Sequence, residues 1–285
     1  MTSDPRLFVT DFDGTLLSDD RRIHPRDLDT LARLKDNDII TAIATGRSLF
    51  SFYRALNQMG LDAERLPVDY LIFSTGAGIT SLESGNLLLS RDIPTSGIKE
   101  ICRCFDGMGF DYMVHKAIPD TPYFLYRENG LNHNPDFYHR IRLYPDFGRP
   151  LDAEPTLYDR ATEVLAILPG GVRPGTLATI QAHLAGFSVI HATSPLDHRS
   201  AWIEVFHPEV SKSRSVGWLA RRLGIRQEQV VAVGNDYNDR DLLDWAGLGF
   251  LVSNGPEDMK RVFAAVAGNN DCGVSDAARV AELLS

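Results

Sequence analysis

Short apolar runs alternate with segments of helical periodicity near both ends of the chain. The runs predict strands at Leu7–Thr10, Ile39–Ala44, Tyr70–Ser74, Val230–Val233 and Gly249–Val252. The segments between them predict helices at Pro25–Lys35, Ser48–Met59 and Ser213–Leu223, and Pro256 is expected to open another helix. Strands that alternate with helices favour an α/β fold, in which a parallel sheet carries helices on both faces.

The middle of the chain, residues 82–207, has a different pattern. It is rich in Tyr, Phe, Pro and His, and "DYMVHKAIPDTPYFLYREN" and "FSVIHATSPLDHRSAWIEVF" predict hairpins. Two helical stretches are expected among these strands, near Ile98–Phe105 and Pro174–Leu184. We therefore expect an α+β domain at 82–207, inserted into a sheet domain formed by 1–81 and 208–285.

Composition narrows the class of protein. The 285 residues suggest about two domains, and 44% hydrophobic with 24% charged residues is ordinary for a globular protein. A net charge of -9 without a basic block argues against nucleic-acid binding, and no apolar stretch is long enough for a membrane span. Three cysteines and no apolar leader behind "MTSDPR" favour a reduced, cytoplasmic protein. We interpret Cys102 and Cys104 as packing residues, because no second Cys or His pair accompanies them.

Polar side chains follow the predicted strands, at the sheet edge where reactive groups collect in such folds. The first strand ends in Asp11 and Asp13, which point to the same side of an extended chain and repel each other unless a cation or a proton intervenes. Further strands end in "ATGRS", "STGAG" and "GNDYND", and Lys212 precedes the helix that leads to the last of these. Each motif alone is typical of a turn, but together they indicate a site.

The motifs "DFDGT", "ATGRS", "SKSRSVGWLARRLGI" and "VVAVGNDYNDRDLL" resemble, in order and spacing, those of the haloacid dehalogenase superfamily of phosphohydrolases, in its Cof-type sugar-phosphatase-like branch. The resemblance covers the sheet domain, and the insertion matches the branch's large cap domain in position and size. It implies a Rossmann-like doubly wound core with an α+β cap, and a phosphatase that acts on sugar phosphates or similar small metabolites.

The resemblance also implies a role for each motif residue. Asp11 would attack phosphorus and form an aspartyl-phosphate, while Asp13 would protonate the leaving alkoxide and later activate water. Mg²⁺, bound by Asp11 and Asp13, would neutralise the paired carboxylates. Thr45 and Lys212 would stabilise the transferring phosphoryl group, together with Gly46 and Asn238 on the phosphate side. Asn238 resembles the family's Asn that holds Lys212 or the phosphate.

One position departs from the family's pattern, which usually reads Gly-Asp-x-x-Asn-Asp. Asn235 stands where the first Asp binds metal, and Asp236 follows it. An amide oxygen can bind Mg²⁺ but supplies no charge. The third metal ligand is therefore expected to be either Asn235, through its carbonyl, or Asp236, directly or through water.

Three other functions share part of the pattern. A response-regulator receiver has a similar acidic cluster, but receivers are shorter and carry the phosphorylated Asp well inside the chain. A phosphomutase of the same superfamily would pass the phosphoryl group to another hydroxyl. A non-catalytic sugar-phosphate-binding protein would have little reason to keep the whole motif set. The cap candidates for substrate selection are His115, Lys116, Tyr123, Arg127 and the cluster 191–199; the pattern predicts neither the sugar nor the oligomeric state.

Overall fold

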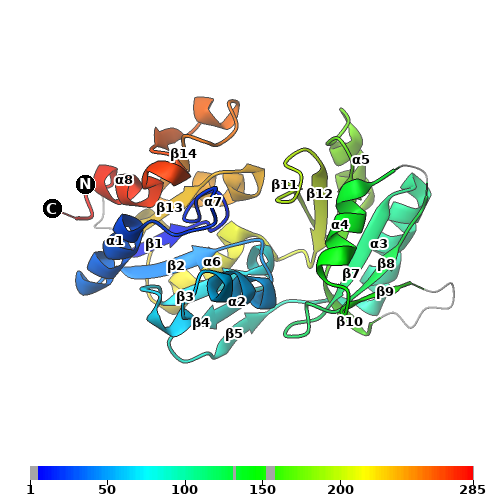
Figure 1. Ribbon diagram of the computed structural model, residues 1–285, viewed down its shortest axis with the longest axis horizontal. Helices are drawn as coiled ribbons and strands as arrows, with labels where there is room; N and C mark the ends of the chain where they lie inside the picture. Colours follow the sequence, from blue (N-terminus) through cyan, green and yellow to red (C-terminus); the bar gives the residue numbers. More distant parts are fainter. Residues whose placement is uncertain (1–5, 131–132, 152–157, 285) are drawn as a thin grey trace. The chain divides into compact units, whose positions relative to one another are not determined.

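The computed structural model describes residues 6–130, 133–151 and 158–284. The chain forms two compact units, a core made of 1–89 with 211–285 and a cap made of 90–210 (Figure 1). The boundaries expected from the sequence, 81/82 and 207/208, lie slightly earlier in the chain. Two more strands, β4 (Gly78–Ser81) and β5 (Leu87–Ser90), extend the core sheet, and the first boundary differs because β5 lies beyond residue 81.

The core sheet has eight strands in the order β15-β14-β13-β1-β2-β3-β4-β5. The strands that the sequence predicts are confirmed, with bounds that shift by at most one residue: β1 (Leu7–Thr10), β2 (Ile40–Ala44), β3 (Tyr70–Phe73), β13 (Val230–Gly234) and β14 (Leu248–Val252). All neighbours from β15 (Ala264–Val266) to β3 are parallel, and β4 pairs antiparallel with β3. Since β1 lies between β2 and β13, the chain order reverses there, and in such folds ligands bind at the carboxyl ends of the strands beside this reversal.

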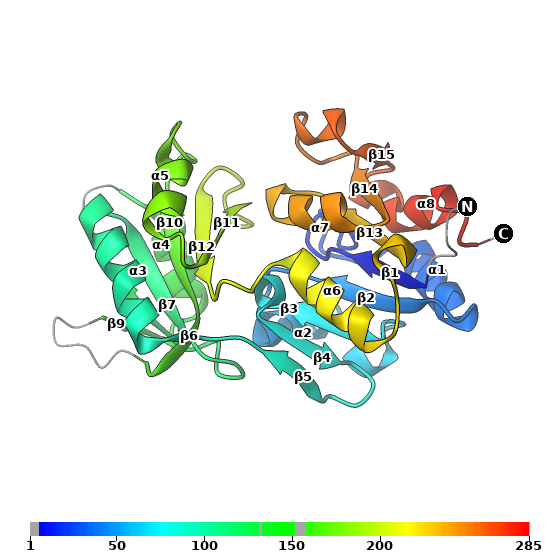
Figure 2. The same ribbon diagram turned by 180° about the vertical axis from the view of Figure 1, so that it is seen from behind.

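Helices cover both faces of the core sheet (Figures 1 and 2). They are α1 (Pro25–Asp36), α2 (Leu49–Gln58), α6 (Lys212–Arg222), α7 (Arg240–Trp245) and α8 (Gly273–Val280). Ser48 and Ser211 cap α2 and α6 by accepting backbone N–H groups of their first turns. The face under α6 packs Leu7, Val9 and Ala232 against Val216 and Leu219.

The prediction of a helix after Pro256 is wrong. The carbonyl of Pro256 accepts from the N–H groups of Met259 and Lys260, but only a 3₁₀ turn, Met259–Arg261, forms. Strand β15 begins at Ala264, so the segment is too short to continue as an α-helix.

The cap holds a second sheet, in the order β11-β12-β10-β7-β8-β9, with β6 paired to β10. Its strands are β6 (Ile93–Pro94), β7 (Asp111–Lys116), β8 (Phe124–Arg127), β9 (Gly148–Pro150), β10 (Arg160–Leu168), β11 (Ser188–Thr193) and β12 (Ala201–Phe206). Both predicted hairpins are confirmed, since β7 pairs antiparallel with β8 and β11 with β12. The central strand β10 was not anticipated.

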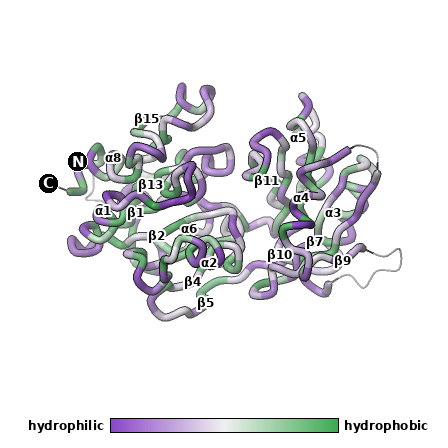
Figure 3. Tube along the Cα trace, in the orientation of Figure 1, coloured by the Kyte–Doolittle hydropathy of each residue, from purple (hydrophilic) through white to green (hydrophobic). Residues whose placement is uncertain are grey.

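Both predicted cap helices form, as α3 (Thr95–Met108) and α5 (Thr176–His183), and α4 (Pro135–Leu143) is additional. One apolar cluster joins α3 and α5 to the sheet and contains Cys102, and another joins α4 through Phe137. Cys102, Cys104 and Cys272 are free thiols. Hydrophobic segments run along the strands of each unit, with hydrophilic ones mostly between them (Figure 3). No helix in the described parts of the chain is long and apolar enough to cross a membrane.

Candidate active site at the carboxyl ends of the core strands

A buried ion cluster lies where β1 and β13 end. Lys212, the first residue of α6, lies with its Nζ 2.6 Å from Asp11 Oδ1 and 2.5 Å from Asp239 Oδ1. Asp11 is 4% exposed, and Lys212 and Asp239 are fully buried. The N–H of Asp11 donates to the Val233 carbonyl, which fixes the end of β1 against β13. The fold thus brings together Asp11 and Lys212, which are about two hundred residues apart in sequence.

The cluster carries an excess of negative charge. Burial raises the pKa of Asp11 to about 7, the nearby Asp239 carboxylate adds to the shift, and Lys212 opposes it. Burial alone would lower the pKa of the Lys212 ammonium, but the two carboxylates raise it above its ordinary value. One ammonium therefore balances two buried carboxylates, and a further cation would relieve the imbalance.

Asp13 turns its carboxylate away from this cluster, toward Arg47. Arg47 Nε lies 2.7 Å from Asp13 Oδ2 and Nη2 lies 2.6 Å from Oδ1, a bidentate ion pair. The guanidinium also lies over the Phe12 ring, 5.5 Å from its centroid. The repulsion between Asp11 and Asp13 is thus resolved by two different cations, one for each carboxylate. Arg47 belongs to "ATGRS", but the sequence did not indicate that it would meet Asp13.

The side chain of Asn235 meets the turn that follows β1. With its amide nitrogen toward that turn, Asn235 donates to Asp11 Oδ2 at 3.2 Å and to the Asp13 carbonyl at 3.1 Å. Thr15 also donates to Asp11 Oδ2, at 3.0 Å. Gly14 lies between them with φ +73°, and a Cβ at Gly14 would collide with the Asn235 amide, so only glycine suits this position. The carboxylate of Asp11, the carbonyl of Asp13 and the amide of Asn235 converge on one point.

The sequence predicted that Asn238 holds either Lys212 or the phosphate, and the structure gives Lys212 another partner. Asp239, not Asn238, holds Lys212, and its Oδ2 also accepts the N–H groups of Asn235 at 2.8 Å and Asp236 at 3.1 Å. Asp236 therefore joins the cluster through its main chain. The assignment changes because a 3₁₀ turn, Tyr237–Asp239, directs the last residue of the motif inward.

Asn238 lies beside the "ATGRS" turn instead. A Cβ placed on Gly46 would lie 3.8 Å from Asn238 Nδ2 and 3.6 Å from Thr75 Oγ1. Thr45 is fully buried, and its Oγ1 accepts the N–H of Arg47 at 3.1 Å. The N–H of Thr75 donates to the Thr45 carbonyl at 3.0 Å. Thr45, Gly46, Thr75 and Asn238 thus form a second polar group at the same strand ends.

A backbone outlier accompanies this group. Ser74 and Thr75 both have positive φ, 48° and 55°, and both are buried. Such backbone is costly for a β-branched residue and concentrates at functional sites. "STGAG" therefore belongs to the site region, although the sequence analysis predicts no role for Thr75.

The groups that converge beside Asp11 include oxygen ligands of the kind that a hard divalent cation prefers. In the described parts of the chain no three His, Cys, Asp or Glu side chains are grouped for a metal. The candidate set is mixed instead, with the Asp11 carboxylate, the Asp13 carbonyl and the Asn235 amide. The amide nitrogen faces the other two groups here, and a half-turn of the amide would bring its oxygen to the same place, where three such oxygens suit Mg²⁺. The carboxylate of Asp13 is paired with Arg47, so the Asp13 group that faces Asn235, and that could bind a metal there, is the main-chain carbonyl.

Among the cap candidates, most have local partners. Lys116 pairs with Asp120 at 2.8 Å, Arg127 lies 3.6 Å from Asp106, and Tyr123 is 46% exposed. His115 is buried, and its Nδ1 lies 3.0 Å from the Thr121 carbonyl. In the cluster 191–199, Asp197 accepts the N–H groups of Arg199 and Ser200, which is turn chemistry.

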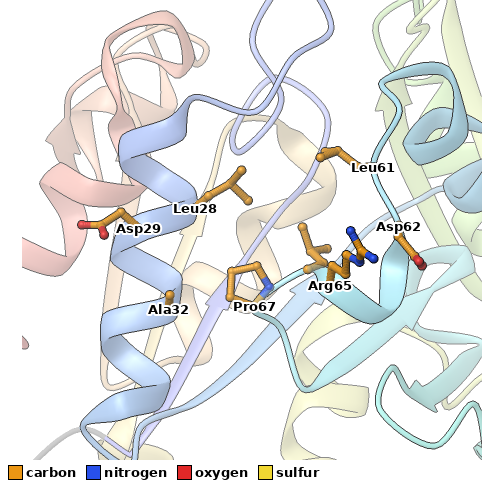
Figure 4. Close-up of a pocket in the computed structure, with 8 residues that line it drawn as sticks. Leu28, Asp29, Ala32, Leu61, Asp62, Arg65 and Pro67 are labelled. Carbon is orange, nitrogen blue, oxygen red and sulfur yellow. The ribbon is translucent and has the colours of Figure 1, made fainter.

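A pocket elsewhere in the core is unrelated to these motifs. It lies between α1 and the segment 61–67, and Figure 4 shows Leu28 and Ala32 of α1 on one side with Leu61, Asp62, Arg65 and Pro67 on the other. None of its lining residues belongs to the buried ion cluster or to the other polar groups at the strand ends.

A haloacid dehalogenase-like hydrolase family model matches residues 8–277. The chain is 25% identical over 277 residues to the 5-amino-6-(5-phospho-D-ribitylamino)uracil phosphatase YitU of Bacillus subtilis, covering 95% of each chain. It is 29% identical over 251 residues to an HMP-PP phosphatase of Escherichia coli, covering 87% of this chain and 84% of that one.

Solved structures agree on the fold. BT1666 from Bacteroides thetaiotaomicron, a phosphatase of the haloalkanoate (HAD) enzyme superfamily, aligns with TM-score 0.78 and 17% identity over 99% of this chain and 96% of its own. The HAD subclass IIB sugar phosphatase BT4131 aligns with TM-score 0.75 and 17% identity over 98% of this chain and 100% of its own. The chain belongs to the haloacid dehalogenase-like hydrolase family. It is an enzyme, a phosphatase.

Proposed function

We propose that this phosphatase hydrolyses phosphomonoesters of small metabolites in a Mg²⁺-dependent reaction, through an aspartyl-phosphate on Asp11. The observation that carries the proposal is the buried Asp11, whose Oδ1 is held by Lys212 and whose Oδ2 faces Thr15 and Asn235. Because both oxygens of this carboxylate are hydrogen-bonded, its orientation is restricted, as a nucleophile requires.

Asp11 Oδ2, the Asp13 carbonyl and the Asn235 amide are the protein groups that would hold Mg²⁺. The ion, when bound, supplies positive charge to Asp11 and to the substrate's phosphoryl oxygens. This role agrees with the excess negative charge of Asp11 and Asp239 around one Lys212.

In the first step a carboxylate oxygen of Asp11 forms a bond to phosphorus, and the bond from phosphorus to the ester oxygen breaks. Asp13 gives a proton to the leaving alkoxide, so it must part from Arg47 when it carries that proton. Lys212, Thr45 and the main-chain N–H groups at Gly46 stabilise the transferring phosphoryl oxygens. Asn238, beside Gly46, acts on the same side.

In the second step Asp13 takes a proton from water, and the water oxygen forms a bond to phosphorus as the bond to Asp11 breaks. Inorganic phosphate leaves, and Asp11 is regenerated as a carboxylate. Release of phosphate, instead of its return to a second hydroxyl, distinguishes hydrolysis from a mutase reaction.

The substrate class rests on the relatives. Their names include a phosphatase for a phosphoribitylamino-uracil, an HMP-PP phosphatase and a sugar phosphatase. We infer a small phosphorylated metabolite, with sugar phosphates as the first class to test.

The decisive variant is Asp11→Asn. An amide is a poor nucleophile, and uncatalysed phosphomonoester hydrolysis is among the slowest reactions known, with enzymatic accelerations of up to about 10²¹-fold. We expect purified Asp11→Asn to fold and to release almost no phosphate from a panel of phosphomonoesters with Mg²⁺. Substantial residual turnover would overturn the assignment of Asp11 as nucleophile.

A further inference from the structure

Three consecutive strands at one side of the core sheet are each followed by an asparagine that holds the same segment. Asn235 follows β13, Asn254 follows β14 and Asn269 follows β15. Their amides reach three carbonyls of the stretch after β1, namely Asp13, Gly14 and Leu17, in that order. The stretch that contains Asp13 is thus held from the neighbouring strand ends.

Among these three asparagines, Asn254 binds the residue after Asp13 and is not itself one of the proposed catalytic or metal-binding residues. Its Nδ2 donates to the Gly14 carbonyl at 2.8 Å, and its Oδ1 accepts the N–H of Asn269 at 3.0 Å. Asn269 is 2% exposed, and its Nδ2 donates to the Leu17 carbonyl at 3.2 Å and to Asp19 Oδ1 at 2.9 Å. Both ends of the Asn254 amide are therefore used, one on the turn and one on a buried anchor.

The peptide after Gly14 is one whose orientation a hydrogen bond is expected to restrict. Gly14 has φ +73° and no side chain, so the chain rotates there more easily than at any other residue type. The carbonyl of Asp13 is bound by Asn235, and the next carbonyl, that of Gly14, is bound by Asn254. Together the two amides define the orientation of the peptides on the C-terminal side of Asp13.

We propose that Asn254 is a positioning residue for phosphoryl transfer, which acts through the Gly14 carbonyl to hold Asp13 in place as the proton donor. The inference rests on the proposed function, because it presumes that Asp13 protonates the leaving group. It assigns Asn254 no contact with the phosphate or the metal.

The test is Asn254→Ala, assayed on phosphoesters whose leaving groups differ in basicity. Asn254 is exposed, so the variant keeps the fold, which its melting temperature verifies. The net value of one hydrogen bond corresponds to about a two- to tenfold change. We expect kcat to fall by that factor for alkyl phosphates, KM to change little, and kcat for an aryl phosphate with an acidic leaving group to stay near the parent value.

Asn270→Ala is the matched control. Asn270 is also an exposed asparagine after β15, but its Nδ2 donates to Asp19 Oδ2 at 2.9 Å, farther along the segment. We expect it to match the parent enzyme on every substrate. Asn254→Asp keeps the acceptor for Asn269 and loses the donor for Gly14, so it is expected to behave as Asn254→Ala does.

Asp13→Asn separates failure of this inference from failure of the proposed function. If Asp13→Asn shows a leaving-group dependence and Asn254→Ala shows none, the positioning role of Asn254 is overturned and the role of Asp13 stands. If Asp13→Asn shows no such dependence, the proton-donor role of Asp13 is overturned, and the role of Asn254 with it.

Discussion

The core and the cap each place two carboxylates near one cation, but the contacts of that cation differ between the two units. In the core, Lys212 lies within 2.6 Å of both Asp11 and Asp239. In the cap, the Arg140 guanidinium lies over the Trp202 ring, 4.5 Å from its centroid, and 3.4 Å from His115 Nε2. Glu163 has His115 as its neighbour, at 3.9 Å.

The looser contacts of the cap favour neutral groups. Burial raises the pKa of Glu163 to about 8, Glu204 adds to the shift, and Arg140 opposes it. Burial lowers the pKa of His115 to about 3, and Arg140 adds to that shift. Both shifts favour the neutral form, of Glu163 and of His115, at neutral pH. Buried charge therefore does not define a site by itself. The core cluster is distinguished by close pairing at strand ends, next to oxygens that fit a metal.

The largest expected difference between the two clusters is the effect of removing each cation. Lys212→Met should lower kcat by about 10²- to 10³-fold, because it removes a donor that stabilises the transferring phosphoryl group. Arg140→Met should lower the melting temperature but leave kcat for a small activated phosphoester nearly unchanged. Steady-state kinetics on folded samples decide this. Equal losses of kcat in both variants would show that the contrast between the clusters is wrong.

A smaller difference is expected within "GNDYND". Asn235→Ala removes an amide that faces Asp11 and the Asp13 carbonyl, so the Mg²⁺ concentration for half-maximal activity should rise severalfold. Asn235→Asp should lower it, since one added charge a few ångströms from the ion is worth up to about 4 kcal/mol before desolvation. Asp236→Ala, which keeps the N–H bond to Asp239, should change it little. A large rise for Asp236→Ala alone would make its carboxylate the third ligand instead.

The smallest effect concerns the stability of the cap. The unfolded chain releases the Glu163 proton near pH 4.5 and the folded chain near pH 8, so the free energy of unfolding falls as the pH rises between these values. Glu163→Gln should remove this loss and stabilise the protein at pH 8 by about 1–3 kcal/mol, with little change at pH 4.5. Urea denaturation at both pH values measures it. Glu209→Gln, at an exposed glutamate, is the control and should show no such gain.

The sequence predicted the parallel core because its strands are uninterrupted apolar runs between helices. β10 was missed because Glu163 breaks such a run, and α4 because "PDFYHRIRL" mixes aromatic and charged residues. The order and spacing of the motifs predicted that Asp11 and Lys212 lie in one site. They could not predict whether Asn238 or Asp239 holds Lys212. That choice depends on a single 3₁₀ turn, which decides which of two neighbouring polar residues points inward. The ion pair between Asp13 and Arg47 could not be predicted for the same reason, because it depends on the direction in which each side chain points.

The ion cluster joins residues that are far apart in the sequence, and this has a consequence for biosynthesis. Asp11 leaves the ribosome about two hundred residues before its partners Lys212 and Asp239. The cap, being continuous from 90 to 210, can fold before they emerge, because domains generally fold as units during synthesis. A nascent chain or a truncated product therefore carries an unpaired Asp11 and an incomplete site. The proposed site is complete only after Asp239 has been made, so a chain that stops before this residue is expected to lack phosphatase activity.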